Sequence, residues 1–319
     1  MESLTAGFFV NPIAAGGSPD PFVVFWEGHY HSVSCHGKDG RSVAVSRARR
    51  LVDVFNAEKA TVYTGAEDGW AVSHWAPELH WRGGRWYVYT CALGHGFPNH
   101  RRRVVVLRGT GRDPRDPFEF AAVLDTGDFY SLDASPFTAP NGKGYLMWSS
   151  TLKPGVDNPC RLYLAEMGDP VTMRHPGQRW PVHDLAYPWE GTVNEGSAIL
   201  VGQKGLHVFF SANAFDSPAY CLGLLSCPDA TPPDCRDWKW TKSPEPVLSR
   251  ADGVYGPGHN CFTVSPDGME TWIVFHAKPS PETGAHRVAC AQRLLWQNGL
   301  PTVAKPVAFG MPVAMPSGD

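Results

Sequence analysis

A short polar motif followed by an apolar, aromatic-rich run recurs five times along this chain of 319 residues. The five motifs are SPDPFV from Ser18, APELHW from Ala76, DASPF from Asp133, NEGSAIL from Asn194 and GHNCF from Gly258. Repetition at a fixed period indicates an architecture of similar units that pack on their neighbours. Each unit reads as strand, turn, strand, with glycine or Asn-Gly at the turn and alternating aromatic and β-branched residues after it. A unit of about sixty residues suits a four-stranded blade, so the pattern predicts an all-β, five-bladed β-propeller.

The repeat leaves no stretch over for a second domain, so we expect residues 1–319 to form one domain. A hydrophobic content of 43% with 18% charged residues is typical of a well-packed globular protein. Helical periodicity is scarce, and Ser46 to Asn56 is the best short candidate for a helix. The net charge of −3 does not favour nucleic acid or anionic membranes as partners. No apolar run approaches the ~20 residues of a membrane-spanning helix.

The first residues, MESLTAGFFVNPI, lack the basic region and the long apolar run of a signal peptide. The chain as written therefore reads as cytoplasmic, or else as a secreted protein whose leader has been removed. Among the 8 cysteines, Cys227 and Cys235 flank a proline-rich loop and could be bridged. His29, His31 and Cys35 share one expected strand and could hold a metal, although ordinary strand packing is the favoured interpretation.

Polar residues mark the start of each unit, and in a propeller the first strand of every blade lines the central channel. The markers are separated by 58, 55, 62 and 64 residues and are Asp20, Glu78, Asp133, Glu195 and His259. We therefore expect them to meet in a funnel at one end of the channel. Clustered carboxylates repel one another, so their pKa values move apart. That separation lets one group stay protonated while another is ionised, as acid–base chemistry at neutral pH requires.

Paired carboxylates with aromatic residues nearby are typical of glycoside hydrolysis, in which one carboxylic acid protonates the leaving oxygen and a second carboxylate activates water or attacks the sugar. Trp75, Phe22 and Trp148 are candidates to stack on sugar rings, although most of the 12 tryptophans must fill space between blades. His259 could bind a cation, orient a carboxylate or satisfy buried backbone. Arg287 could reach the site or lie as a surface charge on an outer strand.

The chain resembles glycoside hydrolase family 43 from about Asn11 to about Thr302. The resemblance rests on the order and spacing of NPI, SPDPFV, WAPELH with GGRWYVYT, DASPF, NEGSAIL, GPGHN, FHA and AQRLLWQNGLP. It implies a five-bladed propeller and a reaction that inverts the anomeric centre with three carboxylates. By this resemblance Asp20 would be the general base, Glu195 the general acid, and Asp133 the residue that tunes and orients the acid.

The same resemblance suggests roles for other residues around the three carboxylates. Arg287 would contact the sugar in the innermost subsite, and a calcium ion, another cation or a water would lie in the channel near His259. No cofactor is expected to be required for the chemistry. Glu78 is expected to support the site, and Glu190 is the alternative to Glu195 as the acid. We favour Glu195 because it occupies the repeat position and leads into a strand.

Within the family, NEGSAIL, YCLGLLS, SPEPVL and YGPGHN look most like the exo-acting α-L-arabinofuranosidases. These release terminal arabinose, so the expected substrates are arabinan, arabino-oligosaccharides or arabinoxylan. A β-xylosidase of the same family is the alternative; because such enzymes usually carry a further domain, a chain that stops after the fifth blade favours the arabinofuranosidase. A non-catalytic sugar-binding propeller is the alternative from a different class.

Overall fold

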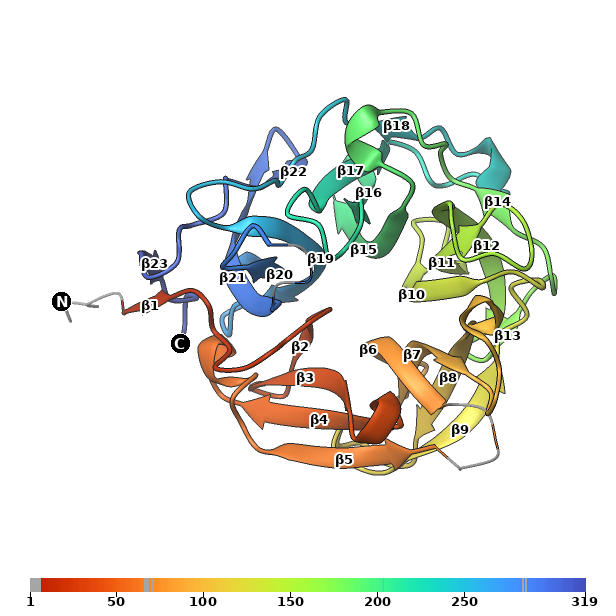
Figure 1. The fold of residues 1–319 in the computed structure, drawn as a ribbon, viewed down its shortest axis with the longest axis horizontal. Coiled ribbons are helices and arrows are strands. Elements are labelled where there is room, and N and C mark those ends of the chain that lie inside the picture. Colours follow the sequence, from red (N-terminus) through yellow and green to blue (C-terminus); the bar gives the residue numbers. More distant parts are fainter. Residues whose placement is uncertain (1–6, 66–68, 70–71, 203, 283, 285) are drawn as a thin grey trace.

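The computed structural model describes residues 7–319, apart from 66–68, 70–71, 203, 283 and 285. In this described part, the strands form five antiparallel sheets arranged as blades around a central channel (Figure 1). The five-bladed propeller predicted from the repeat is therefore confirmed. The first two blades consist of β2 (Phe22–Trp26), β3 (His29–His36), β4 (Ser42–Ala48) and β5 (Lys59–Thr64), then β6 (Val72–Arg82), β7 (Arg85–Leu93), β8 (Arg103–Gly109) and β9 (Phe118–Val123).

The remaining three blades follow in chain order. The third contains β10 (Ser131–Thr138), β11 (Gly144–Thr151), β12 (Cys160–Asp169) and β13 (Thr172–Met173), with β14 (Trp180–Pro181) also paired to β12. The fourth contains β15 (Asn194–Gly202), β16 (Gly205–Ala212), β17 (Cys221–Cys227) and β18 (Thr241–Lys242). The fifth contains β19 (Tyr255–Val264), β20 (Thr271–Lys278), β21 (Val288–Gln297) and β22 (Leu300–Thr302).

Helical structure in the described residues is confined to short 3₁₀ turns in the connections. They are η1 (Lys38–Gly40), η2 (Leu51–Asp53), η3 (Asn99–Arg101), η4 (Pro188–Glu190) and η5 (Cys235–Asp237). The helix predicted over Ser46 to Asn56 is wrong, because most of its first half continues β4 and only η2 is helical. No described helix has the length and apolar character needed to cross a membrane.

Apolar layers between neighbouring blades hold the ring together. One layer joins the first and second blades through Val45, Leu79 and Val88, each of which is at most 1% exposed. Strands that are covered on both faces need apolar side chains on both, which explains the aromatic-rich runs after each motif. Trp148 is fully buried in such a layer beside Tyr163, so its predicted role in stacking on sugar is wrong.

The segment that precedes the first blade is bound along the last blade and closes the ring. β1 (Phe8–Val10) pairs with β23 (Pro312–Ala314), and the two strands lie side by side at the edge of the ring in Figure 1. The Asn11 side chain then exchanges two hydrogen bonds with the backbone of Ala291, at 2.9 and 3.0 Å. The backbone N–H of Ser18 donates to the carbonyl oxygen of Arg287 at 2.9 Å. This closure brings the start of the first blade beside Arg287.

Each blade begins with a residue in the left-handed backbone region. These residues are Asp20 (φ 51°), Ala76 (φ 43°), Asp133 (φ 53°), Gly196 (φ 56°) and His259 (φ 44°). In the second to fifth blades a register irregularity accompanies them. Such a conformation is rare for residues other than glycine and is concentrated at functional sites. The equivalent positions therefore differ from the sequence markers in two blades, because Glu78 lies two residues after Ala76 and Glu195 one residue before Gly196.

All eight cysteines, each within the described part of the chain, are free thiols. The bridge between Cys227 and Cys235 considered from the sequence is therefore wrong. Cys227 is instead fully buried in the layer between the third and fourth blades, where its thiol donates to the carbonyl oxygen of Asp229 at 3.1 Å.

Candidate active site

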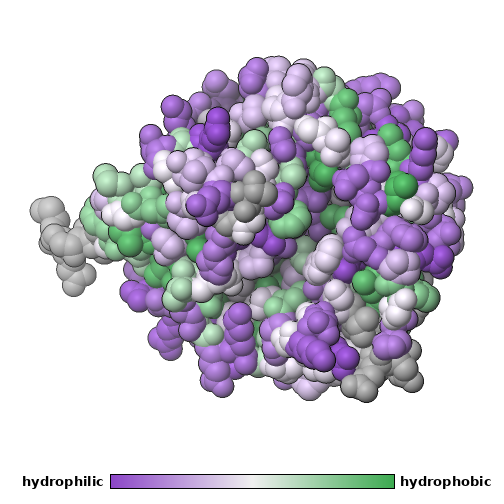
Figure 2. All heavy atoms as spheres, viewed as in Figure 1, coloured by the Kyte–Doolittle hydropathy of each residue, from purple (hydrophilic) through white to green (hydrophobic). Residues whose placement is uncertain are grey.

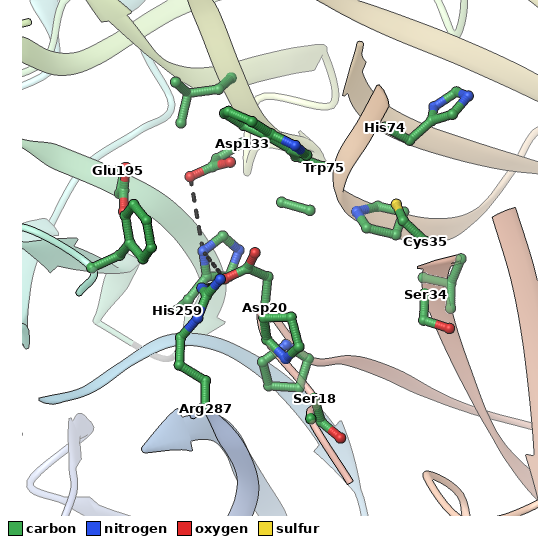
Figure 3. Close-up of a pocket in the computed structure, with 18 of the residues that line it drawn as sticks. Ser18, Asp20, Ser34, Cys35, His74, Trp75, Asp133, Glu195, His259 and Arg287 are labelled. Atoms are coloured by element: carbon green, nitrogen blue, oxygen red, sulfur yellow. Dashed lines mark hydrogen bonds and ion pairs between the residues drawn. The ribbon is translucent and has the colours of Figure 1, made fainter. Parts of the chain in front are cut away.

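A cavity of about 600 Å³ opens where the five blades begin, and the face seen in Figure 2 is hollowed near its centre. Its lining includes Asp20, Asp133, Glu195, His259 and Arg287, which come from the first, third, fourth and fifth blades. These side chains point toward one another in Figure 3. The sequence repeat correctly predicted that Asp20, Asp133, Glu195 and His259 would meet, whereas its remaining marker, Glu78, does not line the cavity.

Asp20 lies beside one arginine and two histidines. Its Oδ1 accepts a hydrogen bond from Arg287 Nη1 at 2.8 Å and lies 3.3 Å from His259 Nδ1 and 3.4 Å from His276 Nδ1. Burial acts to raise the pKa of Asp20, but His259, His276 and Arg287 outweigh it and hold the pKa far below its usual range. Asp20 is therefore ionised at neutral pH, as a general base must be.

The pKa of Glu195 is shifted in the opposite direction, although His259 and Arg287 act to lower it as they do for Asp20. Burial raises the pKa of its carboxyl, and the negative charge of Asp20 acts in the same direction. The Tyr220 hydroxyl, which donates to Glu195 Oε1 at 2.7 Å, limits the rise because it stabilises the ionised form. A carboxyl group that stays protonated above its usual range suits a general acid.

Asp133 lies between these two groups and is bonded to the backbone that carries Glu195. Its Oδ2 accepts a hydrogen bond from the N–H of Gly196 at 3.1 Å and lies 3.8 Å from His259 Nδ1. Burial raises the pKa of Asp133 to about 8, and although His259 opposes the rise, Glu195 and Asp20 add to it. Asp133 is thus placed to hold the backbone next to Glu195.

His259 lies between two of the carboxyl groups, those of Asp20 and Asp133. Burial lowers the pKa of its imidazole, but Asp20, Asp133 and Glu195 together raise it above its usual value. Its backbone N–H donates to Ser211 Oγ at 2.7 Å. Within the described residues, no group of three or more His, Cys, Asp and Glu side chains could hold a metal ion. The Nδ1 of this imidazole lies 3.3 Å from Asp20 Oδ1, so we assign His259 as a partner of Asp20.

Trp75 forms another wall of the cavity. Its side chain is 43% exposed, and the guanidinium carbon of Arg102 lies 3.4 Å from the centroid of its ring. Arg102 itself is only 1% exposed. One face of the indole is therefore fixed by a buried cation, which leaves the exposed part free to meet a ligand.

Two predicted contacts lie away from the cavity lining. Phe22 packs between blades and beside His80, with ring centroids 5.1 Å apart. Glu78 accepts a hydrogen bond from Ser135 Oγ at 2.6 Å, and its Oε2 lies 2.8 Å from His80 Nε2. Because its position is two residues past the bulge, Glu78 joins neighbouring blades and does not face a ligand. We therefore withdraw Phe22 as a candidate to stack on sugar and assign Glu78 a structural role between the blades.

Glu190, the alternative acid, is also outside the cavity. Its side chain is fully buried, forms an ion pair with Lys242 and accepts from the backbone N–H groups of Ala186 and Tyr187, both at 2.7 Å. With its oxygens occupied in this way, Glu190 supports the chain before β15, and Glu195 remains as the candidate acid.

Two residues of the site were missed in the sequence. Tyr220 binds Glu195, and its ring stacks on that of His276 with centroids 5.4 Å apart and planes 5° apart. His276 contacts Asp20, and burial lowers the pKa of its imidazole to about 4. The only signal was their place in the apolar runs YCLGLLS and WIVFHA, where polar side chains are unexpected.

Comparison with known proteins gives concordant matches. Residues 9–301 match the model of glycosyl hydrolases family 43. The extracellular exo-α-(1→5)-L-arabinofuranosidase of Streptomyces avermitilis is 33% identical over 320 residues, covering 95% of this chain and 64% of that protein. The enzyme of the same name from Streptomyces chartreusis is 36% identical over 248 residues, covering 75% of this chain and 74% of that protein.

A solved structure gives a similar result. The crystal structure of α-L-arabinofuranosidase from Lactobacillus brevis superposes with a TM-score of 0.84 at 27% identity, covering 95% of this chain and 98% of that one. By contrast, the chain spans 64% of the length of the Streptomyces avermitilis relative, somewhat less than two thirds.

Proposed function

Because this chain belongs to family 43 of the glycosyl hydrolases, we propose that it is an inverting, exo-acting α-L-arabinofuranosidase. The observation that carries the proposal is the opposite tuning of two carboxyl groups in one cavity. The pKa of Asp20 is held low by cations, and the pKa of Glu195 is raised first by burial. The names of the relatives support arabinofuranose as the released sugar.

In the proposed reaction, ionised Asp20 removes a proton from a water on the face of the sugar opposite the leaving group. The water oxygen bonds to the anomeric carbon while the glycosidic C–O bond breaks, and protonated Glu195 gives its proton to the departing oxygen. Inversion needs room for the water, so the two carboxyl groups should be roughly 6.5–9.5 Å apart in the complex. Asp20 ends the step protonated and Glu195 ionised, and solvent restores both.

The other residues around the carboxylates hold and tune them. Arg287 and His259 fix the orientation of the Asp20 carboxylate. Asp133 holds the backbone at Gly196 and thereby orients Glu195. Burial, helped by the negative charges of Glu195 and Asp20, keeps the Asp133 carboxyl protonated. We propose Trp75 as a wall against the sugar and Arg287 as a contact to its hydroxyl groups.

The test is hydrolysis of p-nitrophenyl α-L-arabinofuranoside and p-nitrophenyl β-D-xylopyranoside by the purified protein. We expect clear preference for the arabinoside, and proton NMR of the first product formed should show the inverted anomer. Glu195→Gln should lose activity, whereas the matched control Glu190→Gln, which changes a carboxyl group outside the cavity, should retain it if folded.

The other outcomes identify the alternatives. Preference for the xyloside would make the protein a β-xylosidase. Binding of arabinose or xylose without hydrolysis of aryl glycosides or arabino-oligosaccharides would make it a sugar-binding propeller. Both Streptomyces relatives are named extracellular enzymes, which favours the secreted alternative for this chain.

A further inference from the structure

A second, smaller cavity adjoins the active-site cavity. It measures about 260 Å³ and shares five lining residues with the larger one, and those residues are Gly17, Pro19, Phe215, Asp216 and Arg287. Gly284 and His286 complete its lining. Because the two cavities share these residues, a ligand longer than one sugar could occupy both.

Phe215 is the aromatic side chain common to both cavities. Its side chain is 51% exposed, and the guanidinium carbon of Arg287 lies 4.8 Å from its ring centroid. The same guanidinium donates to Asp20. A cation over an aromatic ring fixes the orientation of the ring. Phe215 therefore resembles Trp75, which also has a guanidinium on one side and is also partly exposed.

The loop that carries Phe215 is anchored at both ends. Before it, the backbone N–H of Asn213 donates to the carbonyl oxygen of Glu190 at 2.9 Å. After it, the carbonyl oxygen of Ser217 accepts from the ammonium group of Lys278 at 2.6 Å, and Lys278 is completely buried. The Asp216 carbonyl oxygen accepts from the N–H of Gly284 at 3.0 Å. An exposed aromatic ring on a loop held in this way is positioned before any ligand arrives, which reduces the entropic cost of binding.

The position of the loop relative to the candidate acid indicates which part of a substrate it would meet. The loop joins β16 to β17 in the fourth blade, and Glu195 begins β15 of the same blade. Asp20 lies before β2 in the first blade. Because the acid protonates the departing oxygen, the leaving group must lie on the side of Glu195.

We propose that Phe215 is the stacking platform for the sugar ring on the leaving side of the scissile bond, and that the second cavity receives this sugar. The inference rests on the proposed function, because it needs a glycosidic bond placed between Asp20 and Glu195. The ligand class is a neutral pentose ring, whose C–H face stacks on the phenyl group while its hydroxyl groups meet Asp216 and His286. The protein would then distinguish oligosaccharides from glycosides with a small leaving group.

The test compares two substrates in three variants. Methyl α-L-arabinofuranoside has no leaving-group ring, whereas α-1,5-arabinobiose has one. Phe215→Ala should lower kcat/KM for arabinobiose about 10-fold relative to the wild type. For the methyl glycoside, kcat/KM should stay within about 2-fold of the wild type. Phe215→Tyr should restore kcat/KM for arabinobiose. Phe120→Ala removes a side chain that is 42% exposed on β9 and serves as the matched control, with both values unchanged.

A binding measurement separates the platform from effects on catalysis. In the Glu195→Gln background, Phe215→Ala should raise the Kd for arabinotriose about 10-fold, measured by calorimetry. The Kd for L-arabinose should stay unchanged. Equal losses on both substrates, with a shifted acidic limb of the pH profile, would mean that Phe215 acts only through Arg287 and Asp20, and would overturn the inference. No loss on arabinobiose would also overturn it. If the wild type hydrolyses neither glycoside, nor longer arabino-oligosaccharides, the proposed function fails first.

Discussion

Tyr220 controls the proton of the candidate acid, and its hydroxyl group can be removed without removing its ring. The hydroxyl donates to Glu195 Oε1 at 2.7 Å, whereas the ring stacks on His276. Tyr220→Phe keeps the stacking and deletes only the hydrogen bond. Because this bond favours the ionised carboxylate, its loss should raise the pKa of Glu195 further and keep the acid protonated to higher pH.

The size of the effect follows from the charge on the acceptor. Hydrogen bonds to charged groups contribute about 1.5–3 kcal/mol, and about 1.36 kcal/mol corresponds to a tenfold change in a protonation equilibrium. The alkaline limb of the kcat profile should therefore move up by about 1–2 pH units in Tyr220→Phe.

The assay is hydrolysis of p-nitrophenyl α-L-arabinofuranoside between pH 4 and 10, read at saturating substrate. Tyr130→Phe is the control, because Tyr130 also lines the cavity but its hydroxyl accepts from Asn99 and is not bonded to Glu195. An alkaline limb that stays in place or moves down in Tyr220→Phe, with the protein folded, would refute the reasoning and remove Glu195 as the group that titrates there.

Three further outcomes are expected. Asp20→Asn should lower kcat by about 10²–10⁴ while circular dichroism and the melting temperature stay close to wild type. Asp133→Asn should leave the alkaline limb close to its wild-type position, because a pKa of about 8 keeps Asp133 uncharged below that pH and Asn is uncharged as well; a limb that moves to lower pH would show that Asp133 is ionised beside Glu195. Lys242→Met leaves the Glu190 carboxylate buried without its cation and should cost about 3–5 kcal/mol in the free energy of unfolding. In denaturant titrations, the double variant Lys242→Met/Glu190→Gln should lose less free energy of unfolding than Lys242→Met alone. If the losses of the two single variants simply add in the double variant, the two residues are not coupled.

The sequence predicted the fold and the central carboxylates because the repeat expresses one physical requirement. Each blade must cover both faces with apolar residues and begin near the channel, so the same pattern recurs at Asp20 and Asp133. The repeat could not reveal that Glu78 and Glu195 lie two residues after and one residue before the equivalent backbone position. Their offset comes from register shifts in β6 and β15, and no distinctive residue type marks such a shift in the sequence.

The supporting residues were hidden for a different reason. Tyr220 and His276 lie in strands that read as apolar, and their importance arises only when the blades pack and bring them against Glu195 and Asp20. Phe22 was misjudged in the opposite sense, because an aromatic residue next to a motif can pack between blades as readily as it can face a ligand. Proximity in sequence to a reactive group does not determine the direction of a side chain.

The hydrogen bonds from Asn11 to Ala291 in β21 and from Ser18 to Arg287, just before β21, have a consequence for how activity is lost on heating. They form the seam of the ring, and Asp20 stands directly after this seam, while Glu195 is carried by a blade away from it. Fraying of the terminal segment would displace the proton acceptor while the blades stay folded. Hydrolysis should therefore disappear at a lower temperature than the circular dichroism of the sheets. The survival of catalytic activity on heating would then depend on the few residues that form the seam. A covalent link across the seam would protect turnover more than it protects the fold.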